Sequence, residues 1–140
     1  MRIGLDVSGG DFAPKATLHG ALMALKELPS TDQIVLIGDK DVILTFLKEE
    51  KVDPGRFSIV DAPDVIGMDE QPTKALINKS ESSIAVGFRM LKHKEIHAFC
   101  SAGSSGAMMV VQSTVSIQSR GSFVPALPHT YQKKTEVIAS

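Results

Sequence analysis

Two segments of this chain place glycine among small polar residues where a strand is expected to end and a helix to begin. The first segment, residues 3–11, reads Ile-Gly-Leu-Asp-Val-Ser-Gly-Gly-Asp, and the second, residues 97–107, reads His-Ala-Phe-Cys-Ser-Ala-Gly-Ser-Ser-Gly-Ala. An amphipathic run follows each of them. Two such junctions predict an α/β fold, and their backbone N–H groups at helix starts suit phosphate or another oxyanion.

Apolar runs of strand length alternate with apolar stripes of helical spacing along the chain. The four apolar residues Ile34 to Ile37 are typical of a strand that is buried on both faces of a parallel sheet. The alternation predicts parallel β-α-β units in a three-layer sandwich. We expect strands at 3–7, 34–37, 57–60 and 98–101, helices around 14–28, 42–47, 84–91 and 107–115, an irregular stretch at 61–72, and the start of a strand-like run at 137–138.

Composition restricts the class of protein and its compartment. The 140 residues suffice for one domain, and 15 basic against 16 acidic residues leave no electrostatic footprint for nucleic acid. A single cysteine fits a reducing compartment. Asp6 stands where a signal peptide would be apolar, and no apolar run approaches the roughly 20 residues of a membrane span. We therefore expect a cytoplasmic domain without nucleic-acid partners.

The first junction has a functional and a structural interpretation. Gly9 and Gly10 allow the backbone to turn sharply and to approach a ligand closely, and Asp11 could cap a helix or face that ligand. The segment is neither the dinucleotide-binding fingerprint nor a P-loop, because it lacks the third glycine of the former and the lysine of the latter. The structural alternative is a tight turn with a capping aspartate.

The second junction is richer in polar groups. Ser101, Ser104 and Ser105 provide three hydroxyls around Gly103 and Gly106 at a predicted helix start. Hydroxyls and amides that converge there could hold a phosphate without a basic side chain. The alternative is an N-cap serine beside a packing glycine.

Other reactive side chains give weaker indications. Cys100 lies in an apolar strand and is expected to be a buried structural thiol. The two histidines of residues 93–97 lack a third ligand, and the acidic residues of 61–70 match no calcium loop, so we expect neither a metal nor a cofactor. Lys74 and Lys79 could reach an anionic substrate, although solvated lysines are the commoner case.

Taken together, the motifs resemble one known family. Residues 6–14, Asp-Val-Ser-Gly-Gly-Asp-Phe-Ala-Pro, resemble the D-A-M-G-G-D-x-x-P opening of the phosphate acyltransferase (PlsX) family of phospholipid synthesis. Residues 101–107 are similar to that family's S-A-G-N-T-G-A. Residues 68–72 and 82–84 match its M-D-x-x-P and D-S-S-M segments in order and spacing, and residues 125–127 match the P-A-L of its R-P-A-L.

The resemblance implies a Rossmann-like three-layer αβα sandwich with a mainly parallel sheet, similar to phosphotransacetylase and isopropylmalate dehydrogenase. It implies an enzyme that converts acyl-acyl carrier protein and inorganic phosphate into acyl phosphate, without a cofactor, as a homodimer loosely attached to the cytoplasmic membrane face. It also implies that the two junctions lie side by side, although it identifies no catalytic residue. The expected phosphate- and substrate-binding residues are Asp6, Gly9, Gly10, Asp11, Ser101, Gly103, Ser104, Ser105 and Gly106.

The chain also departs from the family pattern. Ser8 replaces a methionine, Ser104 and Ser105 replace Asn-Thr, Asn78 lies where a basic residue is common, and Val124 replaces the arginine before P-A-L. Family members are more than twice as long, so we expect residues 1–140 to be the N-terminal part of the domain, without its C-terminal half. Two alternatives stay open: a phosphate acetyl- or butyryltransferase acting on a coenzyme A thioester, and a non-catalytic phosphate- or nucleotide-binding module. A long apolar acyl pocket would favour the acyl carrier protein enzyme.

Overall fold

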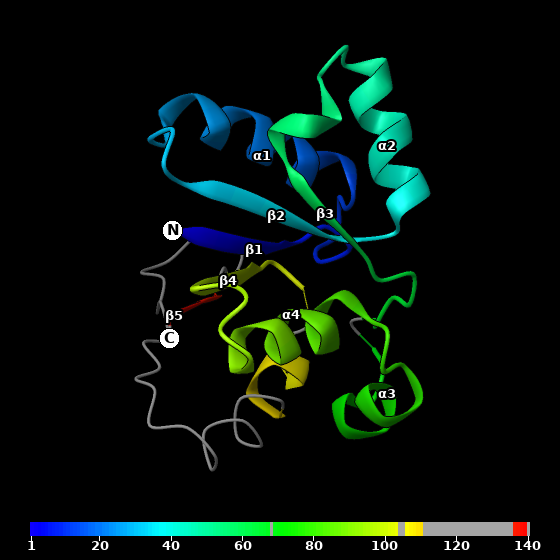
Figure 1. Cartoon of the computed structure of the whole chain (residues 1–140). Helices are drawn as coiled ribbons and strands as arrows, with labels where there is room; N and C mark the ends of the chain where they lie inside the picture. Colours follow the sequence, from blue (N-terminus) through cyan, green and yellow to red (C-terminus); the bar gives the residue numbers. More distant parts are fainter. Residues whose placement is uncertain (68, 104–105, 111–135, 140) are drawn as a thin grey trace, which may run out of the picture.

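One mixed sheet forms the centre of the molecule (Figure 1). The structure is a computed structural model that describes residues 1–67, 69–103, 106–110 and 136–139. The strands lie in the order β3-β2-β1-β4-β5, with β1 to β4 parallel and β5 antiparallel to β4. Their bounds are β1 Arg2–Asp6, β2 Gln33–Gly38, β3 Ser58–Asp61, β4 Ala98–Ser101 and β5 Glu136–Ala139.

Helices cover both faces of this sheet. Figure 1 shows α1 and α2 on one face and α4 on the other. The chain first moves outward from β1 to β2 and β3, and then returns past β1 to β4. Crossover connections between parallel strands are right-handed, so connections that run in opposite directions along the sheet place their helices on opposite faces. The predicted three-layer α/β sandwich with a mainly parallel sheet is confirmed. The helices are α1 Lys15–Glu27, α2 Lys40–Glu49, the 3-10 turn η1 Pro54–Arg56, α3 Pro72–Asn78 and α4 Ser83–Lys92, and residues 106–110 are also helical.

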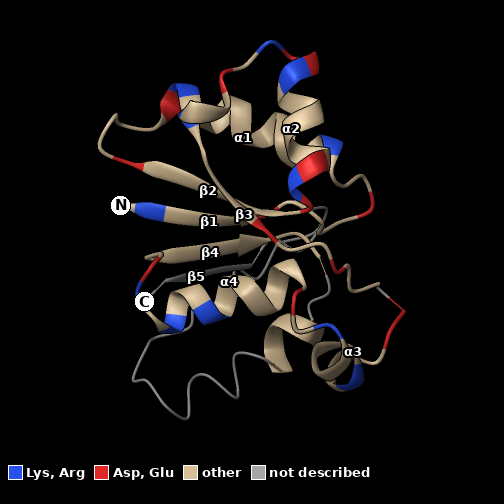
Figure 2. Ribbon diagram, turned by 45° about the vertical axis from the view of Figure 1, so that its right-hand side comes forward, with Lys and Arg blue, Asp and Glu red and all other residues tan. Residues whose placement is uncertain are grey.

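Two apolar cores lie on either side of β2. All of Ile34 to Ile37 are at most 4% exposed, as the continuous apolar run predicted for a strand covered on both faces. Under α1 and α2, the core contains Leu18, Ile43 and Leu47. Under α4, Phe88 and Phe99 meet edge to face with ring centroids 5.5 Å apart. In Figure 2, acidic and basic residues are distributed over the helices and loops, while the strands are almost entirely uncharged.

The sequence-based predictions differ from the structure in three places. The helix α3 was not predicted, and it begins at Pro72, where the predicted irregular stretch ends. Pro14 is the N-cap of α1, one position before the helix that it was expected to begin. The strand-like run at 137–138 becomes the antiparallel strand β5. The stripe residues Val111 and Val115, and also Val124, lie outside the described residues.

Candidate functional site

The two glycine junctions lie side by side. Because β1 and β4 are parallel neighbours, with Leu5 opposite Cys100, their carboxyl ends meet at one edge of the sheet. From β1 the chain order runs one way to β2 and the other way to β4, so this edge is the topological switch point of the sheet. Open α/β sheets bind their ligands there. The adjacency that the family resemblance implied is therefore confirmed.

A buried hydrogen-bond chain joins the junctions. The hydroxyl of Ser101 donates to Oδ2 of Asp6 at 2.6 Å, and the two residues are 3% and 1% exposed. On the first junction, the backbone N–H of Ser8 donates to Oδ1 of Asp6 at 2.9 Å. On the second, the backbone N–H of Gly103 donates to Oγ of Ser101 at 3.0 Å. The last residues of β1 and β4 thus hold both loops in place through buried hydrogen bonds.

The Asp6 carboxyl also contacts α4, which covers the face of the sheet opposite α1 and α2. The hydroxyl of Ser83, the first residue of α4, and the backbone N–H of Gly9 both hydrogen-bond to it. Burial raises the pKa of Asp6 above its ordinary value of 3.8, while the bonds from Ser101, Ser83, Ser8 and Gly9 act in the opposite direction. Asp6 is therefore a buried, fully hydrogen-bonded carboxyl that fixes three segments to one another.

Glycine permits the closest contact between the two loops. A Cβ atom at Gly9 would lie 2.5 Å from Oδ2 of Asp6 and 2.8 Å from the backbone nitrogen of Gly103. A Cβ atom at Gly103 would lie 3.1 Å from Cα of Gly9. Gly10 has a φ of +102°, a conformation that side-chain-bearing residues rarely adopt. The loops can touch only because these positions carry no side chain.

The predicted site residues differ in burial and in position. Asp6 and Ser101 are buried and bond to each other, whereas Asp11 is exposed in the turn before α1. Gly106 opens the helical residues 106–110, while Ser104 and Ser105 lie outside the described residues. Gly9, Gly10 and Gly103 form the contact between the loops. The sequence indicated no bond from Ser83 to Asp6, because the two residues are far apart in the chain.

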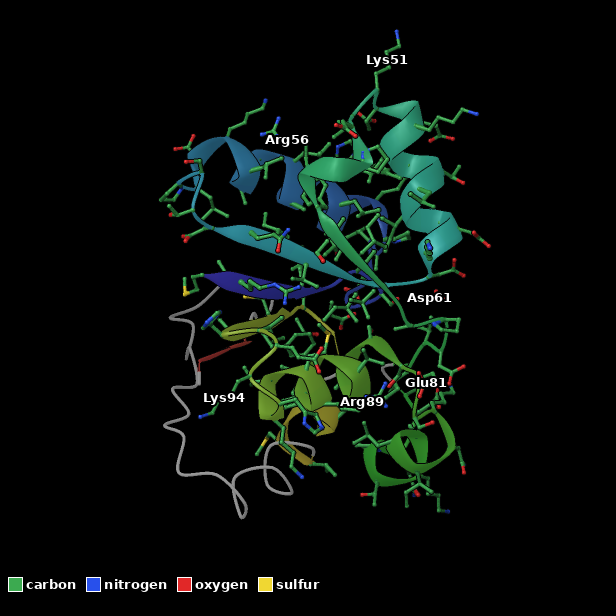
Figure 3. The ribbon with its side chains drawn as sticks, viewed as in Figure 1. Lys51, Arg56, Asp61, Glu81, Arg89 and Lys94 are labelled. Atoms are coloured by element: carbon green, nitrogen blue, oxygen red, sulfur yellow. The ribbon has the colours of Figure 1, made fainter. Side chains whose placement is uncertain are left out.

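The polar residues that follow β3 stabilise loops. Asp61, at the carboxyl end of β3 (Figure 3), accepts a bond from the backbone N–H of Lys40 at 3.0 Å and so helps to cap α2. Lys79 Nζ lies 2.6 Å from Glu70 and 2.6 Å from the carbonyl oxygen of Val65. The bond from Lys79 is the main reason why the pKa of the Glu70 carboxyl is lowered. Lys79 thus clamps this loop to the end of α3.

The remaining candidates lie away from the junctions or lack partners for metal binding. Nδ1 of His97 accepts the backbone N–H of Arg2 at 3.0 Å, at the amino end of β1. Cys100 is half-buried, and burial raises the pKa of its thiol. Among the described residues, no group of three His, Cys, Asp or Glu side chains could hold a metal ion. Within the same part of the chain, no helix is long and apolar enough to cross a membrane. Glu81 and Arg89 form an exposed ion pair of 3.4 Å (Figure 3).

The arrangement at the junctions can hold an anion. Residues 7–10 and the described residues Ala102 and Gly103 lie at the carboxyl edge of the sheet. Backbone N–H groups in such loops, held in advance by buried hydrogen bonds, stabilise negative charge without reorganisation.

Comparisons with known proteins identify the relatives of this chain. A family model described as "Fatty acid synthesis protein" matches residues 1–138. A phosphate acyltransferase of Caldicellulosiruptor saccharolyticus is 40% identical over 127 residues, which are 91% of this chain and 38% of the relative. One from Herpetosiphon aurantiacus is 44% identical over 109 residues, 78% of this chain and 29% of the relative. One from Fusobacterium nucleatum is 35% identical over 136 residues, 97% of this chain and 41% of the relative.

The match thus extends over nearly the whole chain, although the chain spans only about two fifths or less of the length of these curated relatives. It includes both glycine junctions and the segments between them. This chain therefore belongs to the fatty acid synthesis protein family, whose matched curated members are named phosphate acyltransferases.

Proposed function

We propose that this protein transfers the acyl group of acyl-acyl carrier protein to inorganic phosphate, and that phosphate binds where the two glycine junctions meet. The observation that carries the proposal is the hydrogen-bonded contact of these junctions at the switch point of the sheet. Relatives named phosphate acyltransferases support the reaction class. The product, acyl phosphate, would enter phospholipid synthesis.

The chemistry requires little beyond what such loops offer. An oxygen of hydrogen phosphate attacks the thioester carbonyl carbon, a C–O bond forms, the C–S bond breaks, and the carrier thiol leaves with the proton that the phosphate gives up. The site must therefore hold an anionic nucleophile and stabilise the oxyanion of the tetrahedral intermediate. Backbone N–H groups and hydroxyls suit both tasks, because they attract negative charge without neutralising the nucleophile.

The binding residues of the proposal have two kinds of role. Gly10 and Gly106 keep the backbone accessible to phosphate, together with the hydroxyls of Ser104 and Ser105 and the side chain of Asp11, while Gly9 and Gly103 allow the two loops to touch. Asp6 and Ser101 are positioning residues, because they are buried and bond to each other beneath the loops. No residue is assigned as a proton donor or acceptor in the reaction.

Crystals soaked in phosphate or sulfate test the location of the site. The anion is expected between residues 8–10 and 102–106, and an anion bound only elsewhere would reject the assignment. Acyl-hydroxamate formation from acyl-acyl carrier protein and phosphate tests the reaction. In a protein of the full length of the relatives, Gly106→Val should abolish this turnover by blocking the approach of phosphate, with little loss of stability. Turnover only with acetyl- or butyryl-coenzyme A would support the short-chain alternative, and anion binding without thioester cleavage would support a binding module.

The cellular setting belongs to the same proposal. We place the protein in the cytoplasm as a homodimer, in loose contact with the membrane face where its product would be used. Its single cysteine and near-neutral charge support a reducing compartment and the absence of nucleic-acid partners. Sedimentation equilibrium and vesicle flotation measure the two associations directly.

A further inference from the structure

An open apolar groove of about 440 Å³ lies between α1 and the strands β1 and β4, and its α1 residues Ala16 and Gly20 are exposed. It is on the face of the sheet opposite α4. Ile3 and Leu5 of β1 and Cys100 of β4 line one side, and residues of α1 line the other. None of the described residues that line it is charged, and only Thr17 among them carries a hydroxyl. The cavity is within the size range of small-molecule sites, which are mostly apolar.

Small residues of α1 create this space. Ala16, Gly20 and Ala24 follow one another at intervals of four and so lie along one side of the helix, facing the cavity. A Cβ atom added at Gly20 would meet no atom within 4 Å. From Ala16 to Leu28 the lining extends over about 18 Å at 1.5 Å per helical residue. The cavity is therefore an elongated groove.

One end of the groove reaches the junctions. Ala102 lines the cavity, and its carbonyl oxygen is 3.3 Å from the position that a Cβ atom of Gly10 would take. Thr17, at the same end of α1, donates its hydroxyl to the carbonyl oxygen of Gly9 at 3.4 Å. A ligand in the groove would thus have one end beside both glycine loops and the other near Leu28.

We propose that this groove binds the hydrocarbon chain of the acyl substrate, with the thioester end at Ala102 and the methyl end toward Leu28. The inference rests on the proposed function, which requires an acyl carbonyl beside the phosphate. An uncharged groove of this length fits a long, flexible hydrocarbon, whereas an acetyl group would leave most of it empty. The groove therefore selects long-chain over short-chain thioesters, and Gly20 is the residue that keeps it open.

A fluorescent fatty acid tests the groove on the purified chain. cis-Parinaric acid, an 18-carbon polyene that fluoresces in apolar surroundings, is expected to bind saturably. Gly20→Leu places four carbon atoms in the groove, and the loss of three to four methylene contacts should weaken binding by about 100-fold. Met23→Phe is the matched control, because Met23 is on the same helix, is 69% exposed and does not line the groove. It should leave the affinity unchanged.

The sole cysteine supplies an independent measurement. Cys100 lines the groove, so a bound fatty acid should slow its reaction with N-ethylmaleimide, measured at pH 8.5 because burial raises the pKa of the thiol. Octadecanoate is expected to protect Cys100, and butyrate at the same concentration should not. Equal labelling rates with and without octadecanoate would overturn the proposal.

The unfolding temperature of a Gly20 variant shows whether the groove is free for a hydrocarbon or is already filled by polypeptide. Gly20→Ala should raise the unfolding temperature, because the groove has room and alanine favours a helix. If Gly20→Ala lowers the unfolding temperature, protein already fills the groove and the proposal is wrong. Equal affinity of wild type and Gly20→Leu for cis-parinaric acid would also refute it. Fatty-acid binding by a chain whose phosphate-soaked crystals hold no anion at the junctions would support the groove and reject the proposed function instead. Turnover without fatty-acid binding would reject the groove and support the function.

Discussion

Replacing Gly9 by alanine is the sharpest perturbation of the contact between the two junctions. The new methyl group would lie 2.5 Å from Oδ2 of Asp6, 2.8 Å from the backbone nitrogen of Gly103 and 3.0 Å from Oγ of Ser101. Overpacking of this kind costs about 1–3 kcal/mol. Separation of the Asp6–Ser101 hydrogen bond leaves buried polar atoms unsatisfied, at a cost of about 1–3 kcal/mol. We expect Gly9→Ala to lower the free energy of unfolding by about 2–6 kcal/mol, the sum of the two costs.

Alanine substitutions at two other glycines provide reference values for this loss of stability. At Gly103 the nearest atoms would be 3.1 to 3.4 Å from the new methyl group, so a small shift relieves the contact and the loss should be about 1 kcal/mol. At Gly20 the methyl group meets open space within a helix, and alanine should add about 1 kcal/mol of stability. All three substitutions restrict the unfolded chain in the same way, so their differences report the folded contacts.

Urea unfolding of the three variants measures the series. The expected order of stability is Gly20→Ala, wild type, Gly103→Ala and Gly9→Ala, with unchanged m-values. Chemical shifts of the Gly103 amide should change most in Gly9→Ala. A Gly9→Ala variant as stable as the wild type would show that the loops are not in contact, and the hydrogen-bond chain through Asp6 and Ser101 would have to be abandoned.

Three further outcomes are expected. Burial raises the folded-state pKa of Asp6, so the stability that it contributes is lost as pH rises through that value. The Asp6→Asn profile of stability against pH should lack this decline, and a variant profile parallel to that of the wild type in urea unfolding would contradict it. Ser82→Ala should lose about 1 kcal/mol of stability, because the Ser82 hydroxyl accepts the Ala85 N–H at the start of α4, whereas the exposed Ser80→Ala should be neutral in the same assay. Lys79→Met should raise the pKa of Glu70 in a carbon-detected NMR titration, and an unchanged pKa would exclude the clamp.

The periodic parts of the fold could be predicted from the sequence. The run at 34–37 identified the central strand because burial on both faces leaves no polar position, and four parallel strands followed from the alternation with helices. The helix α3 was missed because its seven residues begin at Pro72, next to a loop rich in turn-forming residues. The strand order is set by contacts between distant segments, so the family resemblance, rather than the spacing, gave the neighbouring positions of the junctions.

At the candidate site, residue types were easier to predict than side-chain directions. Asp6 was expected to bind the ligand, yet it is on the face of β1 that is turned toward α4 and accepts the hydroxyl of Ser83. Alternation along β1 contains this information, because Gly4 and Asp6 share one face and both are buried. Whether a carboxyl at the end of a strand faces ligand or protein depends on donors from another helix, which no local pattern reveals.

The direction of the hydrogen bonds limits how phosphate can bind. The backbone N–H groups of Ser8 and Gly9 are directed at the Asp6 carboxyl, and that of Gly103 is directed at Ser101. These three donors hold the scaffold, so in the proposed reaction phosphate would have to be held by other groups of the junctions, such as the amide of Gly10. The buried carboxyl then serves the anion site indirectly, because it fixes the loops while its own hydrogen bonds attenuate its charge. In a phosphate titration, the amide of Gly10 should therefore shift strongly and those of Ser8 and Gly103 only weakly, and the opposite pattern would show that the loops reorganise to bind the anion.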